Sequence, residues 1–295
     1  MNFTNKVQST LKGLHYWLIF VIEITNFILM KIYRLIKVVL LLLVGYLPFV
    51  SLAWGVEGHR IVGQIAESYL TVNAKKEINK ILGTETIAMV SNWGDFVKSD
   101  PSYDYLYHWH YLDLKSGLTI GEVQSFLDKD TIADTYTKIH FLVTELKNKK
   151  LSKEKKVIYL KLLIHFVGDI HQPLHVGMEE NLGGNKTKVM WFNDSKNLHV
   201  IWDSELILFQ QLSYTEYTTA INHTSYEQRK RWQKEPISDW VIESYQLTQK
   251  ICDEITQPNQ RLEYKYNFKY VSILNQQLLK GGVHLAGLLN DIFKG

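Results

Sequence analysis

The sequence predicts a single all-α domain over residues 54–295, with one short irregular or hairpin segment near residues 177–198. Two observations lead to this fold class. Apolar residues recur at intervals of three and four over most of the chain, which is the spacing of one helix face. Only residues 177–198 replace this spacing with glycines and with alternating apolar and polar residues. We find no internal repeat and no linker composition that would divide the domain.

The first helices are expected in the N-terminal half of the domain. One opens near Gly58, where the apolar residues of 61–70 mark a single face. Thr71 or Asn73 can cap the next helix, because either side chain can accept a hydrogen bond from a backbone N–H of the first turn. That helix continues to Leu82. Further helices are expected over residues 120–126 and 133–146.

The most apolar helical pattern covers Lys155–Asp169, and we expect this helix to be buried on nearly every face. Pro173 ends it, because proline has no backbone N–H to continue a helix. Residues 183–185 (Gly-Gly-Asn) and the alternation over residues 189–193 predict a loop and a short hairpin. Helical spacing returns near His199, over residues 239–255 and over residues 270–293.

Residues 30–53 have the organisation of a secretory signal peptide. Basic residues follow Met30, an apolar run covers residues 38–47, and Ser51-Leu52-Ala53 has the small-x-small pattern of a cleavage site. Cleavage after Ala53 would make Trp54 the first residue of a secreted or periplasmic protein.

Residues 1–29 make this leader longer than the usual ~15–30 residues. We therefore interpret Met30 as the true start and residues 1–29 as a mis-annotated extension. The alternative is a membrane anchor formed by the apolar stretch 14–29. Contact with a membrane is expected only through the leader, if it is not cleaved.

The leader also carries the excess of positive charge. The chain has 33 lysines and arginines and 30 acidic residues. Residues 1–53 hold five of the basic residues and one of the acidic residues, so 28 basic and 29 acidic residues remain in the rest of the chain. A nearly neutral domain has no bulk positive field for nucleic acid, so any affinity for phosphate must come from a local site. The single cysteine, Cys252, excludes an internal disulfide framework. This composition suits a bacterial periplasm or medium better than a eukaryotic secretory route.

Histidines and aspartates occur at spacings that suit metal ligation. His165 and Asp169 lie four residues apart on a predicted helix, so their side chains leave the same face, and His199 and Asp203 form a second such pair. Neutral imidazole and carboxylate are the ligands of catalytic zinc sites, whereas one cysteine cannot build a thiolate site. Further candidates are His59, Asp95, His110, His175 and Trp54, whose free amino group and carbonyl can chelate a metal.

Some of these residues also have a simpler interpretation. A single histidine on an apolar helix is more often a hydrogen-bonded core residue, and we apply this interpretation to His140, His223 and His284. A single His–Asp pair is often an ordinary helix-surface contact. Two such pairs, together with the further candidates, are harder to explain in this way, because burying so many ionisable groups without compensating charge is costly.

With these residues the chain resembles the single-strand-specific nucleases and 3′-nucleotidases of the S1/P1 type, which hold three zinc ions and share a fold with bacterial zinc phospholipase C. The resemblance covers residues 54–295, and its motifs follow the family's order at close to its spacing. They are Trp54-Gly-x-x-Gly-His59, Asn92-Trp-Gly-Asp95, His110-Tyr-Leu-Asp113, His165-Phe-Val-Gly-Asp169-Ile-His-Gln-Pro-Leu-His175, Gly183-Gly-Asn185 and Asn197-Leu-His199-x-x-Trp-Asp203.

The resemblance implies a division of ligands among three Zn²⁺ ions. One ion takes Asp95, His110, His165 and Asp169. A second takes His175, His199 and Asp203, and a third takes Trp54, His59 and the other oxygen of Asp169. His108 is a rival for His110, although the family's continuation fits His110 better. His171 has no ligand role by analogy and is expected to orient a neighbour.

The resemblance also implies the reaction, which is hydrolysis of single-stranded DNA and RNA to 5′-phosphate products, with 3′-nucleotidase activity on nucleotides. Asp169 bridges two ions, and Asp95 orients the nucleophile or accepts its proton. Lys98 matches a basic residue that contacts phosphate, although a solvated helix charge explains it equally well.

Base recognition is expected from three further residues. Tyr111 stacks on any base, which suits a sequence-tolerant enzyme, and Asp113 and Asn185 add hydrogen-bonding groups at the pocket. Core packing is the alternative role for Tyr111, since the chain is rich in aromatic residues. No stable protein partner is implied.

Two other functions remain open at this point. A zinc phospholipase C would have nearly the same metal site, but it should show an exposed apolar rim where a nuclease shows a stacking slot. An exported zinc-binding protein without catalysis would close its ligand shells, whereas the candidate ligands here leave open positions on three ions.

Overall fold

The computed structural model describes residues 30, 31, 33 and 54–294. The predicted leader therefore lies almost wholly outside the described residues, and so does the predicted cleavage site. The chain divides into two units, residues 1–50 and 51–295. All elements named below belong to the second unit. Among the described residues, no helix combines the length and the apolar character needed to cross a bilayer.

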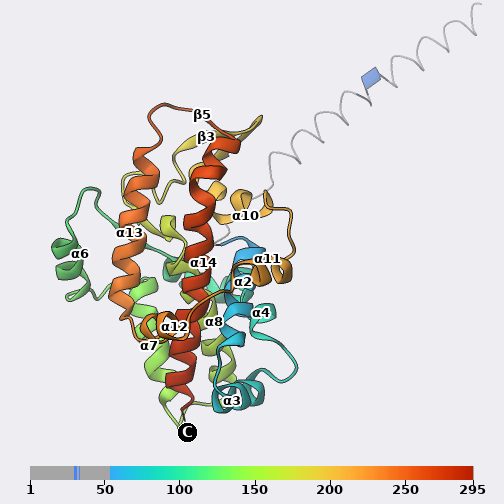
Figure 1. The fold of residues 1–295 in the computed structure, drawn as a ribbon, viewed down its shortest axis with the longest axis vertical. Coiled ribbons are helices and arrows are strands. Elements are labelled where there is room, and N and C mark those ends of the chain that lie inside the picture. Colours follow the sequence, from blue (N-terminus) through green and yellow to red (C-terminus); the bar gives the residue numbers. More distant parts are fainter. Residues whose placement is uncertain (1–29, 32, 34–53, 295) are drawn as a thin grey trace, which may run out of the picture. The chain divides into compact units, whose positions relative to one another are not determined.

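Helices dominate the second unit, and the all-α fold class is confirmed (Figure 1). The N-terminal half contains α2 (Val56–Ser68), α3 (Val72–Leu82), α4 (Ile87–Val90), α5 (Trp93–Phe96), η1 (Val97–Ser99), η2 (Pro101–His110), α6 (Ile120–Leu127), α7 (Thr135–Lys147) and α8 (Lys153–Ile170). The C-terminal half contains η3 (Pro173–His175), α9 (Leu198–Val200), the π-helical turn η4 (Ile201–Glu205), α10 (Leu206–Leu208), α11 (Tyr214–Ile221), α12 (Tyr226–Trp232), α13 (Ile237–Asp253) and α14 (Tyr264–Ile292).

Helix α8 lies within the core, as its apolar pattern predicts. Every residue from Leu160 to Ile170 is buried, including the polar Lys161, His165 and Asp169. Helices α2, α7 and α14 pack against it, and α14 is the long red helix in Figure 1. Two polar side chains of α8, at positions 165 and 169, are therefore held in an apolar surrounding where only strong partners can stabilise their charge.

Five short strands complete the unit. β1 (Leu112–Leu114) pairs in parallel with β2 (Val176–Met178), with Asp113 opposite Gly177. β3 (Lys188–Trp191) and β4 (Asp194–Asn197) form an antiparallel hairpin, which confirms the predicted hairpin near residues 177–198. β5 (Gln260–Leu262) pairs in parallel with β3. The β1–β2 pair matters for function, because it joins the segment after His110 to the segment after His175.

Several sequence expectations are corrected by the structure. Helix α14 begins at Tyr264, six residues before the predicted start, because Tyr266 and Tyr270 both pack into the core. Helices α11 and α12 escaped prediction, since short helices rich in polar residues carry little periodic signal. The interpretation of His140 and His223 as core residues is wrong, because both are exposed. The same interpretation is confirmed for His284, which is buried.

Candidate metal centre and substrate pocket

Eight buried histidines and aspartates gather from seven separate segments of the chain. We call this group the His/Asp centre. Its members are His59 on α2, Asp95 on α5, His110 at the end of η2, His165 and Asp169 on α8, His175 in η3, His199 on α9 and Asp203 in η4. All eight were predicted from the sequence as candidate ligands. His59 and Asp169, for example, are 110 positions apart in the chain but are brought together by the tertiary fold.

Local structure aims both predicted pairs at the centre. On α8, the spacing of four residues puts His165 Nε2 3.3 Å from Asp169 Oδ2. The same spacing puts His199 Nε2 3.3 Å from Asp203 Oδ2, where the chain passes from α9 into the π-helical turn. A π-helical turn is rare and occurs mostly at functional sites. Both pairs therefore present one imidazole and one carboxylate side by side.

Asp169 is the midpoint of the His/Asp centre. Its Oδ2 lies 3.0 Å from His110 Nδ1, while its Oδ1 lies 3.3 Å from His59 Nε2 and 3.6 Å from His175 Nδ1. The two oxygens of one fully buried carboxylate thus face different histidines. This arrangement allows Asp169 to bridge two cations.

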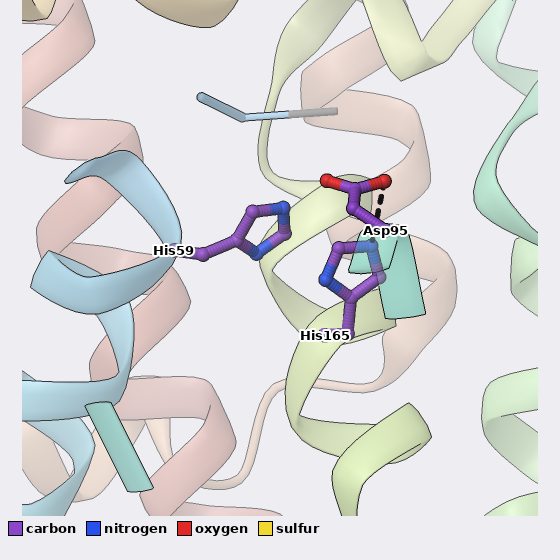
Figure 2. A group of neighbouring side chains, drawn as sticks. All are labelled: His59, Asp95 and His165. Atoms are coloured by element: carbon purple, nitrogen blue, oxygen red, sulfur yellow. Dashed lines mark ion pairs between the residues drawn. The ribbon is translucent and has the colours of Figure 1, made fainter. Parts of the chain in front are cut away.

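Three groups of ligand atoms in the centre are close enough to hold a metal ion. They are His59 with Asp95 and His165, His110 with His165 and Asp169, and His175 with His199 and Asp203. Figure 2 shows the first group, with the side chains of His59, Asp95 and His165 converging from three elements and Asp95 3.6 Å from His165. The third group has the composition expected from the sequence. The first combines His59 with Asp95 and His165, and the expected neighbour of His59, Asp169, also lies 3.3 Å from its Nε2.

Backbone carbonyls fix the orientation of three histidines. The Nδ1–H of His165 donates to Ser91 O at 2.7 Å, that of His175 to His110 O at 2.8 Å, and that of His199 to Gly183 O at 2.7 Å. Because a carbonyl can only accept, each ring carries a proton on Nδ1 and turns Nε2 toward the centre. In metal-ligating histidines, the nitrogen that does not bind the metal typically donates to a carbonyl or carboxylate in this way.

Several other side-chain atoms of the centre have no hydrogen-bond partner among the described residues. His59 Nε2, His110 Nε2, His175 Nε2, Asp169 Oδ1 and Asp203 Oδ2 are buried and make no hydrogen bond. Buried polar groups normally have a partner, and leaving one unpaired costs about 1–3 kcal/mol. So many unpaired atoms facing one another fit a set of cation ligands, and the donors are the imidazoles and carboxylates that zinc prefers.

The charges of the His/Asp centre favour the binding of a cation. Burial raises the pKa of Asp169, but the neighbouring His165 and His175 outweigh burial and hold this pKa well below its ordinary value. Burial lowers the pKa of His110 to about 4 and also lowers the pKa of His59 and His199. Burial also lowers the pKa of His165 and His175, but the neighbouring Asp169 outweighs burial and raises both, that of His175 to about 9. Metal binding would displace the protons of these two rings, because imidazole ligates metal in its neutral form.

A cavity of about 230 Å³ lies over the His/Asp centre. His110, His175 and His199 contribute to its lining. The predicted pocket residues Lys98, Tyr111, Asp113 and Asn185 also line it, together with Tyr107, Leu174, Leu182 and Gly183. Aromatic rings, hydrogen-bonding groups and one cation thus surround the opening to the candidate ligands.

Comparison with known proteins decides the assignment. The sequence profile described as "S1/P1 Nuclease" matches residues 54–294. The chain belongs to the S1/P1 nuclease family. It is therefore a phosphodiester hydrolase, and among the functions left open by the sequence the nuclease is the one that the comparison supports.

Curated relatives of this nuclease carry the same kind of name. Endonuclease 2 of Arabidopsis thaliana is 30% identical, in a match that covers 81% of this chain and 90% of that protein. Nuclease S1 of Aspergillus oryzae is 24% identical over 81% of this chain and 91% of the relative. Nuclease P1 of Penicillium citrinum is 26% identical, in a match that covers 81% of this chain and 97% of that protein.

A search of solved structures finds the Alpha Toxin from Clostridium absonum. It is 15% identical to the nuclease, with a TM-score of 0.40, and the match covers 81% of this chain and 63% of that chain.

The structure separates the rival histidines of the nuclease. His110 is buried in the His/Asp centre, whereas His108 is exposed and its Nδ1 lies 2.7 Å from the hydroxyl of Tyr111. His171 lies outside the three ligand groups: its Nδ1–H donates to Val167 O, and its Nε2 lies 2.6 Å from His284 Nδ1. His171 thus links the end of α8 to α14.

Two residues of the site were missed by the sequence analysis. Gln172 is fully buried, and its side-chain amide donates to Asp203 Oδ1, which orients the carboxylate. Its place between two motif histidines was the only signal available. Tyr107 lines the pocket beside Tyr111, with ring centroids 6.1 Å apart, and nothing in the sequence distinguishes it from the other aromatic residues around it.

Gly94 is a sensitive position in the nuclease, because a Cβ built there would lie 2.5 Å from His165 Cδ2. Gly94→Ala should displace the His165 ring, lower the free energy of unfolding by ~1–3 kcal/mol through overpacking, and reduce bound metal. Thermal melting and elemental analysis would check this. Gly121→Ala is the matched control, because nothing lies within 4 Å of its Cβ. Equal metal content in Gly94→Ala and the wild type would contradict the account.

Proposed function

We propose that this nuclease depends on three zinc ions and hydrolyses single-stranded DNA and RNA to 5′-phosphate products, with 3′-nucleotidase activity on nucleotides. One observation carries the proposal: buried imidazole nitrogens and carboxylate oxygens, several of them without a hydrogen bond, gather in three groups, and His110, His175 and His199 of these groups line a single pocket. Zinc is the metal of choice because histidine and carboxylate ligands without thiolate are typical of catalytic zinc sites.

The ligands are assigned as the sequence motifs suggest. Asp95, His110, His165 and Asp169 would hold one zinc ion, and His175, His199 and Asp203 a second. The third would be held by His59, by the other oxygen of Asp169, and by the amine and carbonyl of Trp54. The two Asp169 oxygens that face different histidines support this division, and the close approach of His59 to both Asp169 and Asp95 is compatible with it.

Trp54 is proposed as the N-terminus of the mature enzyme, after removal of residues 30–53 during export. Two observations support this. The family match begins at residue 54. The Trp54 side chain is fully buried, and the adjacent Gly55 N–H donates to Asp203 O at 2.6 Å, which anchors this end of the chain beside a proposed ligand. The nuclease domain would then cover residues 54–295, and the enzyme would be secreted or periplasmic.

Zinc supplies two things to phosphodiester hydrolysis: it lowers the pKa of bound water to about 7 and it neutralises charge on the phosphate. The protein's own residues provide positioning. Lys98 Nζ lies 2.6 Å from Asp95 Oδ1 and also lines the pocket, so its ammonium can meet a phosphate there. Asp95 is proposed to orient the attacking water or to accept its proton.

The pocket walls suit a nucleobase. Tyr111 offers an aromatic face, and burial raises the pKa of its hydroxyl to about 12, so the ring stays neutral beside a phosphate. Burial also raises the pKa of Asp113, whose strand position opposite Gly177 places it at the pocket. Stacking on one ring requires an accessible base face, which a duplex hides. This accounts for a preference for single strands.

A substrate panel tests the proposed function. Processed enzyme should cleave single-stranded DNA and RNA, release phosphate from a 3′-nucleotide and leave a phosphatidylcholine emulsion intact. Product analysis should find 5′-phosphates. Hydrolysis of the lipid alone would contradict the base-pocket proposal while preserving the metal ligands, and turnover of none of the four substrates by zinc-loaded protein would contradict the proposed activity.

Removal of zinc should destabilise the enzyme, because the ligands tie together segments that are distant in the chain. Treatment with EDTA should lower the melting temperature by at least about 10 °C. This corresponds to a loss of several kcal/mol for a domain of this size, at roughly 2–4 °C per kcal/mol. Calorimetry before and after adding zinc back would measure the change. An unchanged melting temperature would count against metal as a structural element of the fold.

A further inference from the structure

The segment that leads into the pocket carries exposed aromatic rings that the core does not need. Tyr105 and Tyr107 in η2 are 55% and 62% exposed, although both neighbour buried or half-buried residues such as Leu106 and Trp109. Exposed apolar surface that is contiguous often marks a site of interaction with a partner. The question is which partner fits.

The geometry of η2 arranges its rings in rows. A 3-10 helix has three residues per turn and rises about 2.0 Å per residue, so residues three apart lie above one another about 6 Å apart. Tyr105 and His108 share one row, and Tyr111 follows η2 in extended conformation, where its ring meets that of His108. The ring centroids of His108 and Tyr111 are 5.9 Å apart, and their polar tips lie within hydrogen-bond distance at 2.7 Å. We call these three residues the stacking row.

The stacking row is continuous with the pocket at one end and with a cation at the other. Tyr111 lines the pocket over the His/Asp centre. At the far end, the Tyr105 ring packs edge-on against Trp109, with centroids 5.4 Å apart. The Nζ of Lys138 lies 4.5 Å from the centroid of the same Trp109 ring. The acidic residue of this helix, Asp104, belongs to the row of Tyr107 and His110 rather than to the stacking row.

We propose that the stacking row and Lys138 form a track on which a single-stranded nucleic acid continues out of the cleavage pocket, its bases stacked on Tyr105 and His108 and a phosphate near Lys138. This inference rests on the proposed function, because it extends the substrate site from one nucleotide to several. The rings have polar tips and stand about one turn apart, which suits successive bases better than a continuous lipid-binding surface. The cation at the far end complements the charge of a strand.

The track predicts that substrate length matters. The wild-type enzyme should cleave an oligothymidylate decamer with a higher kcat/KM than the dinucleotide, which reaches only the pocket. Tyr105→Ala should lower kcat/KM for the decamer about tenfold and leave the dinucleotide unchanged, since stacking on one aromatic side chain contributes enough for roughly a 5- to 150-fold effect. Tyr105→Phe, which keeps the ring, should behave like the wild type on both substrates.

Two further variants sharpen the test. Phe268→Ala removes an aromatic ring that is 85% exposed on α14, outside the track, and should change neither rate. Lys138→Gln should reduce the slope of log kcat/KM against log salt for the decamer by about 0.7, the value for one phosphate contact on a single strand. Circular dichroism would confirm that all variants are folded.

The outcomes separate the track from the function on which it rests. If the wild type cleaves the dinucleotide but Tyr105→Ala cleaves the decamer as fast as the wild type does, the track is overturned and the nuclease proposal stands. Equal losses on both substrates would assign Tyr105 a structural role and also overturn the track. If the wild type cleaves neither substrate, the proposed function fails and the track fails with it.

Discussion

Replacing Asp169 with asparagine should remove two of the three proposed zinc ions and lower nuclease activity by more than about 1000-fold, because several kcal/mol of charge stabilisation by metal is lost. Asparagine keeps the volume of aspartate but offers one carbonyl oxygen and no charge. In the structure, the two Asp169 oxygens face separate histidines, with Oδ2 near His110 and Oδ1 near His59. One oxygen cannot serve both sides. Elemental analysis and a single-stranded DNA assay would measure the two effects.

A matched control distinguishes this effect from a general loss of negative charge. Asp291→Asn removes a carboxylate that pairs with Lys147 at the surface, and such exposed pairs typically contribute only ~0–1 kcal/mol. This variant should retain full zinc content and activity. If Asp169→Asn also retained three zinc ions per chain, Asp169 could not be the bridging ligand.

Adding one residue before Trp54 should weaken zinc binding at the proposed third site. An amide nitrogen has no basic lone pair, so an extended chain loses the proposed amine ligand. Even outer-shell changes at metal sites cost roughly 10–100-fold in affinity, so loss of a direct ligand should cost at least about tenfold.

The two forms to compare are an enzyme with an added N-terminal glycine and an enzyme processed to begin at Trp54, purified in the same way. Zinc content and activity would be measured for both. The processed form should bind three zinc ions and the extended form two, with lower activity. Equal zinc content and equal activity would exclude the terminal amine as a ligand.

The sequence was sufficient to predict much of the site. All eight members of the His/Asp centre were named in advance, because the His165–Asp169 and His199–Asp203 spacings and the motif order are local features. The burial of α8 on all faces was predicted over residues 155–169 and holds from Leu160 to Ile170, where apolar residues surround both proposed ligands, whereas residues 155–159 are exposed or half-buried. These features could be predicted because helix periodicity is visible in the local sequence.

Other features depend on contacts that no local pattern encodes. The parallel β1–β2 pair joins segments more than 60 residues apart, and it is this pairing that holds Asp113 beside the pocket. The grouping of His59 with Asp95 and His165 likewise follows from how α2, α5 and α8 pack. The stacking row escaped prediction because it requires a 3-10 rather than an α-helical geometry in η2. Each of these was decided by packing between distant elements.

The most direct test of the account is a zinc titration of the processed, metal-free enzyme. Bound zinc and hydrolysis of single-stranded DNA would be measured on the same samples. The account predicts that activity is absent without metal, returns with added zinc and stops rising when three zinc ions are bound per chain. Full hydrolysis by protein that holds no zinc, or saturation of binding without any hydrolysis, would contradict the assignment of the His/Asp centre as the catalytic metal site.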